Sequence, residues 1–268
     1  EKNSEKFNDY KNNYINPNTA YAHVSGGSNS IDKDSSGSTY ADIVGGMSNS
    51  LKKAAMSAIV GGQSNSILNS LFSAILGGTN NKITVRGLAK CFIAGGENNE
   101  ITENGSNSVI FGGSGNKVTN SFSAILGGMD NTVSGYFSAV VGGMNNTVTG
   151  RYSTVLDGYS NTVKSDNSAV IAGSGNTVEC FSCVVCGGGN KILNSGGNAG
   201  YNVFVCGEHN EVTNAQNCII CGKYAKATRE HFFVIGGGSD KGNVYWVDVY
   251  GNVYAKSFNI IGESTASE

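Results

Sequence analysis

The cysteines are the residues of this chain whose spacing most resembles a chemical site. The seven cysteines include Cys180-x-x-Cys183-x-x-Cys186 and Cys218-x-x-Cys221, with Cys206 between the two groups. Such spacing is typical of zinc ligands. Residues three apart on a strand, however, point to opposite faces, so each pair is poorly placed to chelate a metal. We therefore expect buried free thiols, as in a reducing cytoplasm, with a metal site and disulfides as the alternatives.

Aromatic side chains recur at a spacing that suggests a carbohydrate-binding surface. They stand five residues before a repeated small residue, and the candidates for ligand contact are Tyr40, Phe72, Phe122, Phe137, Tyr152, Phe181 and Tyr201. Aromatic faces bind sugar rings, so a column of them along a rod would form a glycan-binding stripe. The competing interpretation is packing within a turn or between protomers. Lys90, Asn107 and Asn167 interrupt the column, which His231 would extend.

No combination of residues predicts catalysis. The three histidines, His23, His209 and His231, are far apart in the sequence. Carboxylates are few, and only Asp157 enters a repeated column, where it replaces a glycine. Paired carboxylates, or a nucleophile with its base, are the combinations that hydrolytic and transfer chemistry requires. We predict a protein that is not an enzyme, with no catalytic residue, no cofactor and no metal.

Two further patterns are typical of ligand-binding solenoids. The segment GGSGNKV is similar to the calcium-binding nonapeptide, but it does not repeat every nine residues, and Asn116 stands where that motif needs Asp. The second pattern is a regular array of threonines of the kind found on ice-binding solenoids, made of Thr132, Thr147, Thr162 and Thr177. With only four members, the array does not predict ice binding.

The composition argues against an ordinary globular domain. Of 268 residues, 39 are Gly and one is Pro, and 14% are charged, against about a quarter in a typical soluble domain. The net charge is −2 with Lys and Arg scattered, so we predict no nucleic-acid partner. No apolar run approaches the ~20 residues that span a bilayer, so we predict no membrane insertion.

These residues are positioned by a repeat of about 15 residues. Its anchor is the first small residue after an apolar pair, and the fourteen anchors are Gly26, Gly45, Gly61, Gly77, Gly95, Gly112, Gly127, Gly142, Asp157, Ala172, Cys186, Cys206, Cys221 and Gly236. Both residues before the anchor are apolar, and the first of them is usually β-branched, which favours a strand. Because adjacent strand residues point to opposite faces, this strand is apolar on both faces.

Eleven of the repeats also contain an asparagine after the anchor, with an apolar residue two positions further on, as in Asn146 and Val148. Paired glycines and the asparagine indicate a turn with positive φ, followed by a second short strand. We predict that the asparagines stack as a ladder in which each amide bonds to the same amide above and below.

We therefore predict an all-β fold: a β-solenoid of about 14 coils of about 15 residues over residues 21–238. A polar connector precedes it over residues 1–20. A C-terminal hairpin or cap segment follows over residues 239–268, with a turn at Tyr250-Gly251-Asn252. A two-strand coil has one interior, so the second apolar face needs a cover. A cyclic trimer is the natural closure, and a dimer is the alternative.

Several repeats resemble a known family. NSVIFGGSGNKVTN, YFSAVVGGMNNTVTG and YSTVLDGYSNTVKSD resemble the head repeats of trimeric autotransporter adhesins (YadA-like), which also occur in phage tail-fibre proteins. YAHVSGGSNS is similar to a variant common in the phage proteins. The resemblance covers roughly residues 21 to 236. It implies a left-handed parallel β-roll, a homotrimer, and attachment to a host or cell surface.

The end of the chain favours the phage relatives. GNVYWVDVYGNVYAKSFNI is similar to segments that precede the self-cleaving chaperone domain of tail fibres, which implies a cleavage point near Ser267-Glu268. We expect a trimeric fibre head or shaft that attaches to a bacterial or host cell surface through a glycan or protein receptor. Its location would be the virion tail fibre or the cell surface. The alternatives are a bacterial adhesin head, an enzyme on a β-solenoid, and a purely structural spacer.

Overall fold

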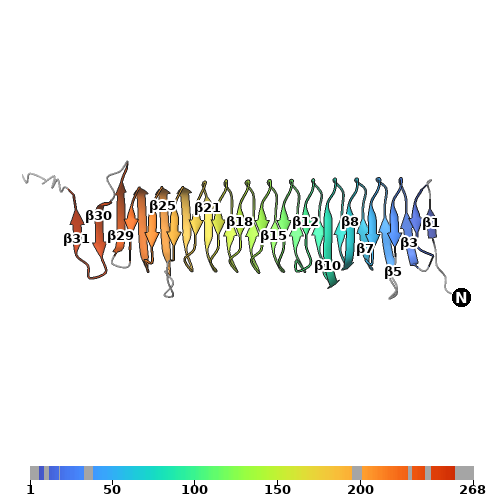
Figure 1. Cartoon of the computed structure of the whole chain (residues 1–268), viewed down its shortest axis with the longest axis horizontal. Coiled ribbons are helices and arrows are strands. Elements are labelled where there is room, and N and C mark those ends of the chain that lie inside the picture. Colours follow the sequence, from blue (N-terminus) through green and yellow to red (C-terminus); the bar gives the residue numbers. More distant parts are fainter. Residues whose placement is uncertain are drawn as a thin grey trace, which may run out of the picture.

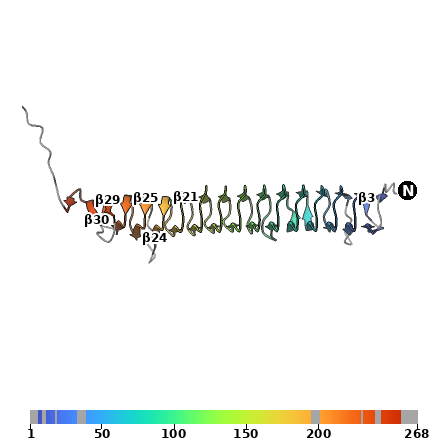
Figure 2. The same cartoon turned by 90° about the horizontal axis from the view of Figure 1, so that it is seen from above.

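The chain forms a straight rod. The computed structural model describes residues 6–8, 12–17, 19–32, 39–194, 201–228, 231–238 and 243–256. Over these residues it is an all-β solenoid of about 13 turns with a spacing of about 16 residues. Figures 1 and 2 show the coils stacked side by side along one axis. The predicted β-solenoid is thereby confirmed.

One strand of every coil belongs to a 17-stranded sheet, called sheet A here. Its strands from β1 to β29 pair in parallel, each with the strand of the next coil, and β30 and β31 follow in antiparallel order. The strands are β1 (Lys6–Asn8), β3 (Ala20–Val24), β5 (Thr39–Ile43), β7 (Ser57–Ile59), β9 (Ala74–Ile75), β11 (Phe92–Ile93), β13 (Val109–Ile110), β15 (Ala124–Ile125), β17 (Ala139–Val140), β19 (Thr154–Val155), β21 (Ala169–Ala172), β23 (Val184–Gly188), β25 (Val203–Glu208), β27 (Cys218–Lys223), β29 (His231–Gly237), β30 (Asn243–Asp248) and β31 (Val253–Ala255).

The other strand of each coil belongs to a parallel 14-stranded sheet, called sheet B. Its strands are β2 (Tyr14–Ile15), β4 (Ser30–Asp32), β6 (Ser50–Lys52), β8 (Ser66–Leu71), β10 (Lys82–Leu88), β12 (Glu100–Ile101), β14 (Lys117–Val118), β16 (Thr132–Val133), β18 (Thr147–Val148), β20 (Thr162–Val163), β22 (Thr177–Val178), β24 (Lys191–Leu193), β26 (Glu211–Thr213) and β28 (Lys226–Ala227). Single parallel bridges, such as Met129 with Met144, join the turns between the two sheets.

The core is a thin double row of β-branched and leucine side chains. Each coil contributes one residue from sheet A, such as Val140, and one from sheet B, such as Val148, and both are fully buried. The residue after the buried one in sheet A points outward, as Val141 does after Val140. The two apolar faces predicted for this strand are therefore present, and one of them lies on the surface of the single chain.

The inward column changes register after β21. The sequence places Val184, Phe204 and Ile219 two residues before their anchors, as inward residues. In the structure Val185, Val205 and Ile220 are the buried ones, and Phe204 and Ile219 are exposed. The physical reason is a lost turn residue: Asn190 follows Val185 by five residues, whereas Asn176 follows Val170 by six. A strand irregularity between Val170 and Ala172 absorbs the difference.

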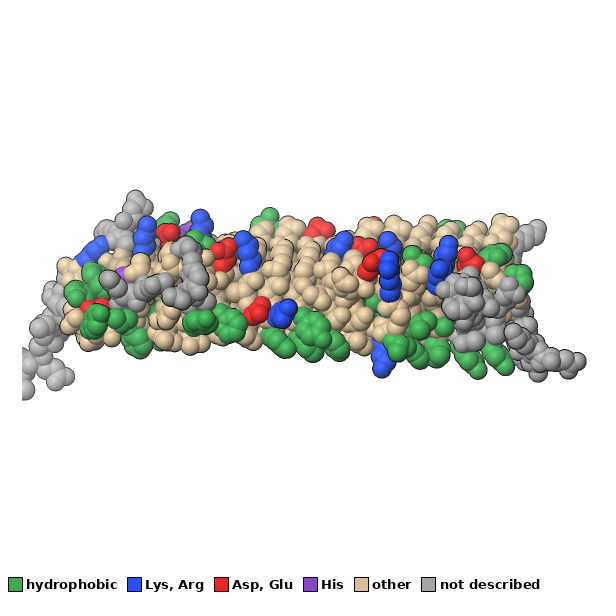
Figure 3. Space-filling model, turned by 60° about the horizontal axis from the view of Figure 1, so that its bottom comes forward, with side chains coloured by type: hydrophobic (Ala, Val, Ile, Leu, Met, Phe, Trp, Pro, Cys, Tyr) green, Lys and Arg blue, Asp and Glu red, His purple; other side chains and the backbone are tan. Residues whose placement is uncertain are grey.

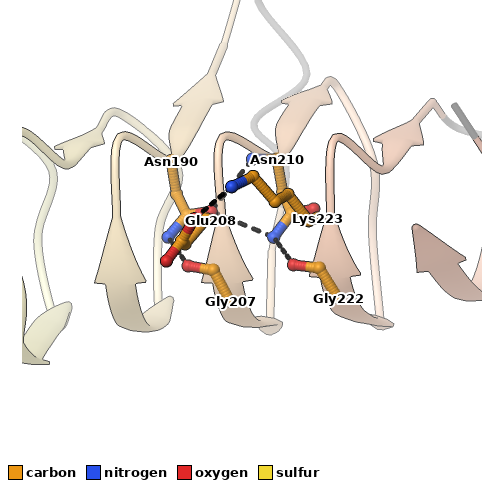
Figure 4. Close-up of polar contacts among 6 residues, drawn as sticks. All are labelled: Asn190, Gly207, Glu208, Asn210, Gly222 and Lys223. Atoms are coloured by element: carbon orange, nitrogen blue, oxygen red, sulfur yellow. Dashed lines mark hydrogen bonds and ion pairs between the residues drawn. The ribbon is translucent and has the colours of Figure 1, made fainter. Parts of the chain in front are cut away.

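Buried asparagines join the coils, and the predicted amide-to-amide ladder is present from Asn116 to Asn210, whereas the asparagines of earlier coils bond only to backbone groups of the neighbouring turns. The Oδ1 of Asn146 accepts a hydrogen bond from the backbone N–H of Asn161 (3.0 Å), and its Nδ2 donates to the carbonyl of Gly158 (2.8 Å). Figure 4 shows the same arrangement for Asn190 and Asn210, which bond to Gly207 and Gly222 of the following coils. Amide-to-amide bonds are added only from Asn131 onward, as between Asn146 and Asn131 (3.1 Å).

A second buried polar column is made of serines that stand two residues before the buried residue of sheet A, as Ser138 does before Val140. The Oγ of Ser123 accepts from the backbone N–H of Ser138 (3.3 Å) and donates to the carbonyl of Gly135 (2.7 Å). The next serine repeats the pattern, since Ser138 bonds to Ser153 and Gly150. Both hydrogen-bonding functions of each hydroxyl are thus used between neighbouring coils, as buried polar groups require.

The solenoid extends into the ends of the sequence. Within residues 1–20, expected to be a connector, β1 pairs in parallel with β3 and β2 with β4. At the other end β30 and β31 form the predicted hairpin, with Val247 opposite Val253. Trp246 packs against the core. The expected cleavage point at Ser267-Glu268 lies outside the described residues.

Candidate functional site

Five of the predicted aromatic residues occupy one turn position with an unusual backbone conformation. Tyr40, Phe72, Phe122, Phe137 and Tyr152 have φ between 54° and 62°. Each directly precedes a buried residue of sheet A, as Phe122 precedes Ser123. Bulky side chains rarely adopt this left-handed region. Their side chains are 41% to 58% exposed, so the rings lie on the outside of the turn.

Three of these rings form a continuous stack along the rod. Phe122 and Phe137 stack with ring centroids 4.8 Å apart, and Phe137 and Tyr152 with centroids 5.3 Å apart. Tyr136 packs edge-on against both phenylalanines. Both faces of Phe137 are therefore covered by its neighbours. A sugar ring packs on the face of an aromatic ring. Phe137, in the middle of the stack, exposes only its ring edge and so provides no face for a glycan.

The remaining predicted aromatics lie in separate groups. Phe181 and Tyr201 pair with each other at 5.6 Å, but they stand one position before the turn column, where Ser182 and Asn202 have the positive φ. This offset follows from the lost turn residue. Tyr40 stacks on Tyr21 at 5.0 Å, a partner that was not among the candidates although it also stands five residues before its anchor, Gly26. Its signal was present, because Tyr21 precedes Ala22 as Tyr40 precedes Ala41.

The outer face of sheet A carries a long column of exposed apolar side chains. Its members follow the buried isoleucines and valines, are 40% to 56% exposed, and include Val44, Val60, Leu76, Phe111, Leu126, Val141, Leu156 and Ile171. Met129, Met144 and Tyr159 are exposed at the adjoining turns. Figure 3 shows another side of the rod, where most of the charged side chains lie along one edge and separate groups of apolar side chains lie along the other.

The charges on the outside of sheet B pair between coils. Lys82 and Lys117 flank Glu100 at 3.5 and 3.0 Å, and Lys164 lies 2.9 Å from Glu179. Burial alone would raise the pKa of Glu100, but the hydrogen bonds and charges of Lys117 and Lys82 together lower it. Such exposed pairs contribute about 0 to 1 kcal/mol each. The lysines on this face are thus neutralised by neighbouring glutamates and do not form a continuous positive stripe.

A polar corner near the C-terminal end was not found from the sequence. Glu208 and Lys223 form an ion pair at 2.7 Å, drawn in Figure 4. The hydrogen bond and charge of Lys223 lower the pKa of Glu208. Next to them, His209 and Tyr224 stack at 5.2 Å. His209 and Tyr224 have positive φ at a turn position where other coils have Ser, Asn, Asp or Gly. A bulky ring at this position is the sequence signal that could have identified the corner.

The structure corrects two expectations about the cysteines. By spacing, Cys183 and Cys218 correspond to the alanines that stand three residues before the anchor in other coils, such as Ala124 before Gly127. In the structure they stand in the buried serine column, where the N–H of Cys183 donates to the Oγ of Ser168. Cys180 and Cys183, expected to be free thiols, form a disulfide; both are buried, with Cα atoms 6.1 Å apart. Cys91, Cys186, Cys206, Cys218 and Cys221 are free. No group of three possible metal ligands lies together in the described residues.

The other candidates remain isolated. Asp157 accepts a hydrogen bond from the adjacent N–H of Gly158 (2.7 Å), which makes it part of its own turn. Thr132, Thr147, Thr162 and Thr177 lie in register along sheet B, as the repeat requires. His231 packs near Trp246, whereas His209 stacks on Tyr224 in another coil.

Two comparisons with known proteins found no match. The chain matches no family model, and no curated protein matches it. In the described part of the chain there is no helix of the length and apolarity needed to cross a membrane.

Proposed function

We propose that the chain is the head or shaft of a homotrimeric fibre, a left-handed parallel β-roll that attaches to a cell surface. A phage tail fibre is the form that the repeats and the C-terminal segment resemble most. The observation that carries the proposal is the exposed apolar column on the outer face of sheet A. It recurs in consecutive coils, at a position that the fold of one chain leaves uncovered.

The energetics favour association along this column. Full burial of a Val or Leu side chain contributes about 1.5 to 3 kcal/mol, so covering the exposed half of each contributes about 1 kcal/mol. Eight such residues on one chain, repeated in register, provide a driving force that grows with the number of coils. Rigid rods that meet along equivalent faces close as a cyclic oligomer. Three copies of a weak receptor site on one rod would then bind by avidity.

The oligomeric state can be tested by light scattering coupled to size exclusion. Wild-type protein should have three times the mass of one chain. Changing Leu126, Val141 and Leu156 to Glu should reduce the mass to that of one chain, or cause aggregation. The matched control changes Thr132, Thr147 and Thr162 to Glu on the outer face of sheet B and should stay trimeric. A stable wild-type monomer would overturn the trimer.

Attachment can be tested separately, by sedimenting the fibre with a panel of bacterial cells. Phe137→Asn breaks the aromatic stack and places at that turn the residue that Asn107 and Asn167 provide in other coils. If the stack contacts the receptor, the variant should bind at least tenfold more weakly. The second candidate function is a structural spacer, favoured by the covered faces of Phe137. Unchanged binding after Phe137→Asn and after changes at every other exposed turn would support it.

A further inference from the structure

Three free cysteines form a row across neighbouring strands of sheet A. Cys186 on β23 pairs in register with Cys206 on β25, which pairs with Cys221 on β27. Each follows a buried residue, so all three side chains lie on the outer face, and all are half-buried. Ala172 and Ile235 occupy the same register position on the strands to either side, so the row ends at three thiols.

Strand spacing brings neighbouring thiols within reach of a covalent bond. Adjacent strands lie about 4.8 Å apart, and disulfides join Cα atoms about 4.4 to 6.8 Å apart. The outer two cysteines are separated by two strand spacings, about 9.6 Å, which is too far for a disulfide. The central Cys206 therefore belongs to every bond that the row can form.

The thiols also affect one another. Burial, a hydrogen bond with the Cys206 thiol, and repulsion from Cys206 and Cys221 raise the pKa of Cys186 to about 11. Because the thiolate is the form that attacks a disulfide, oxidation of this row should be faster at alkaline pH.

We propose that Cys186, Cys206 and Cys221 form an oxidation site at which a disulfide joins neighbouring coils of one chain through Cys206. The co-reactant is a small disulfide such as oxidised glutathione. The thiolate of one cysteine attacks it and forms a mixed disulfide, releasing one small thiolate. The neighbouring thiolate then attacks the bound cysteine sulfur and releases the second. The two cysteines lose two electrons to the reagent, and their two protons go to the released thiolates.

The third thiol allows the disulfide to exchange between the two neighbouring pairs of cysteines. When Cys186 is bonded to Cys206, the Cys221 thiolate can attack the Cys206 sulfur and release the Cys186 thiolate, with no net oxidation. The proposal depends on strand register within one chain and not on the trimer. If two chains meet along this face, their thiols have the alternative of bonding between chains, and the experiment below distinguishes the two outcomes.

The test treats the full-length protein with oxidised glutathione. It then counts free thiols in denaturant and maps linked peptides by mass spectrometry without reduction. Wild type should fall from five free thiols to three, with peptides linked through Cys206. Cys186→Ser and Cys221→Ser should each fall from four to two, because one neighbouring pair remains. Cys206→Ser should form no linked peptide, and any loss of its thiols should appear only as glutathione adducts.

Cys218→Ser is the matched control, because Cys218 lies on β27, three residues before Cys221, but faces inward; the variant should fall from four free thiols to two. Circular dichroism and size exclusion should show each variant folded like wild type. Three results would overturn the proposal: wild type that keeps five free thiols, Cys206→Ser that forms an intrachain link as readily as Cys186→Ser, or links found only between chains on a non-reducing gel.

Discussion

The buried asparagines connect neighbouring coils as the backbone hydrogen bonds of the sheets do, because their side chains bond to backbone N–H and carbonyl groups of the neighbouring turn. Asn146 bonds to Asn161 on one side and Asn131 on the other, and its Nδ2 also reaches the carbonyl of Gly158. Asn fits the position because its side chain is both donor and acceptor on one short stem. Asp would lose the donor and add a buried charge.

We expect Asn146→Ala to destabilise the protein by about 3 to 5 kcal/mol, since more than one buried backbone group loses its partner at about 1 to 3 kcal/mol each. Urea unfolding followed by circular dichroism would measure the change. The control is Asn145→Gly, at an exposed neighbour with φ of 56° that glycine adopts freely. A loss for Asn146→Ala no larger than the loss for the control would contradict this role.

Cys218 should make stability depend on alkaline pH. Burial raises its pKa from 9.0 to about 12. The folded thiol therefore holds its proton when the unfolded thiol has lost it. Its contribution is complete below pH 9 and is lost as pH rises toward 12, at up to about 1.4 kcal/mol per pH unit. The urea midpoint between pH 9 and 10.5 should fall more steeply in wild type than in Cys218→Ser, and equal slopes would refute the effect.

At the scale of the elements, the turn after each sheet A strand needs one particular glycine of its pair. Gly143 has φ of 87°, and a Cβ there would collide with the carbonyl oxygen of Gly158 in the next coil. A Cβ on Gly142 would meet only Asp157 Oδ1, at 3.7 Å. The close approach of stacked turns, rather than flexibility, explains why the second glycine recurs.

Gly143→Ala should therefore lower the melting temperature by 10 °C or more or prevent folding, because two neighbouring turns must separate. Gly142→Ala should shift it by only a few degrees. Thermal melts followed by circular dichroism would compare the two variants directly. Similar melting temperatures for both would show that the contact between turns does not limit the stacking.

At the scale of the whole molecule, each coil contacts chiefly the coils before and after it. Stability is then a sum of similar coil-to-coil terms, as in other repeat proteins. Asn116, Asn131 and Asn146 are each 15 residues apart, so removal of one such interval brings equivalent positions together.

Deleting residues 131–145 should leave a folded rod that is one coil shorter, with a β-type circular dichroism spectrum and cooperative unfolding. Deleting residues 131–137 should not, because about half a coil would place sheet A residues in sheet B positions and expose the core. Both deletions remove residues from the same coil, but only the longer one keeps the strands that follow in register with the sheets. A folded product from the shorter deletion would contradict this account.

The sequence alone determined the repeat, the two strands of each coil and the strand that is apolar on both faces. These features follow from local rules that apply in the same way to each coil. The rules are the alternation of side chains along a strand and the tolerance of Gly and Asn for positive φ. The terminal hairpin could be predicted in the same way, since the alternation of Trp246 and Val247 and the turn after them lie within one short segment.

The tertiary structure alone decided which residues meet between coils. Phe137 is covered because Phe122 and Tyr152 of the neighbouring coils stack on its two faces. Cys183 stands in the serine column rather than with the alanines, because one turn residue was lost after Val185. A change of one residue in a turn shifts the side chains of the coils that follow relative to their anchors, as at Val205 and Ile220, and spacing counted from the anchor does not register it. Only the hydrogen-bonded register of adjacent strands identifies the neighbours of each aromatic ring and each thiol.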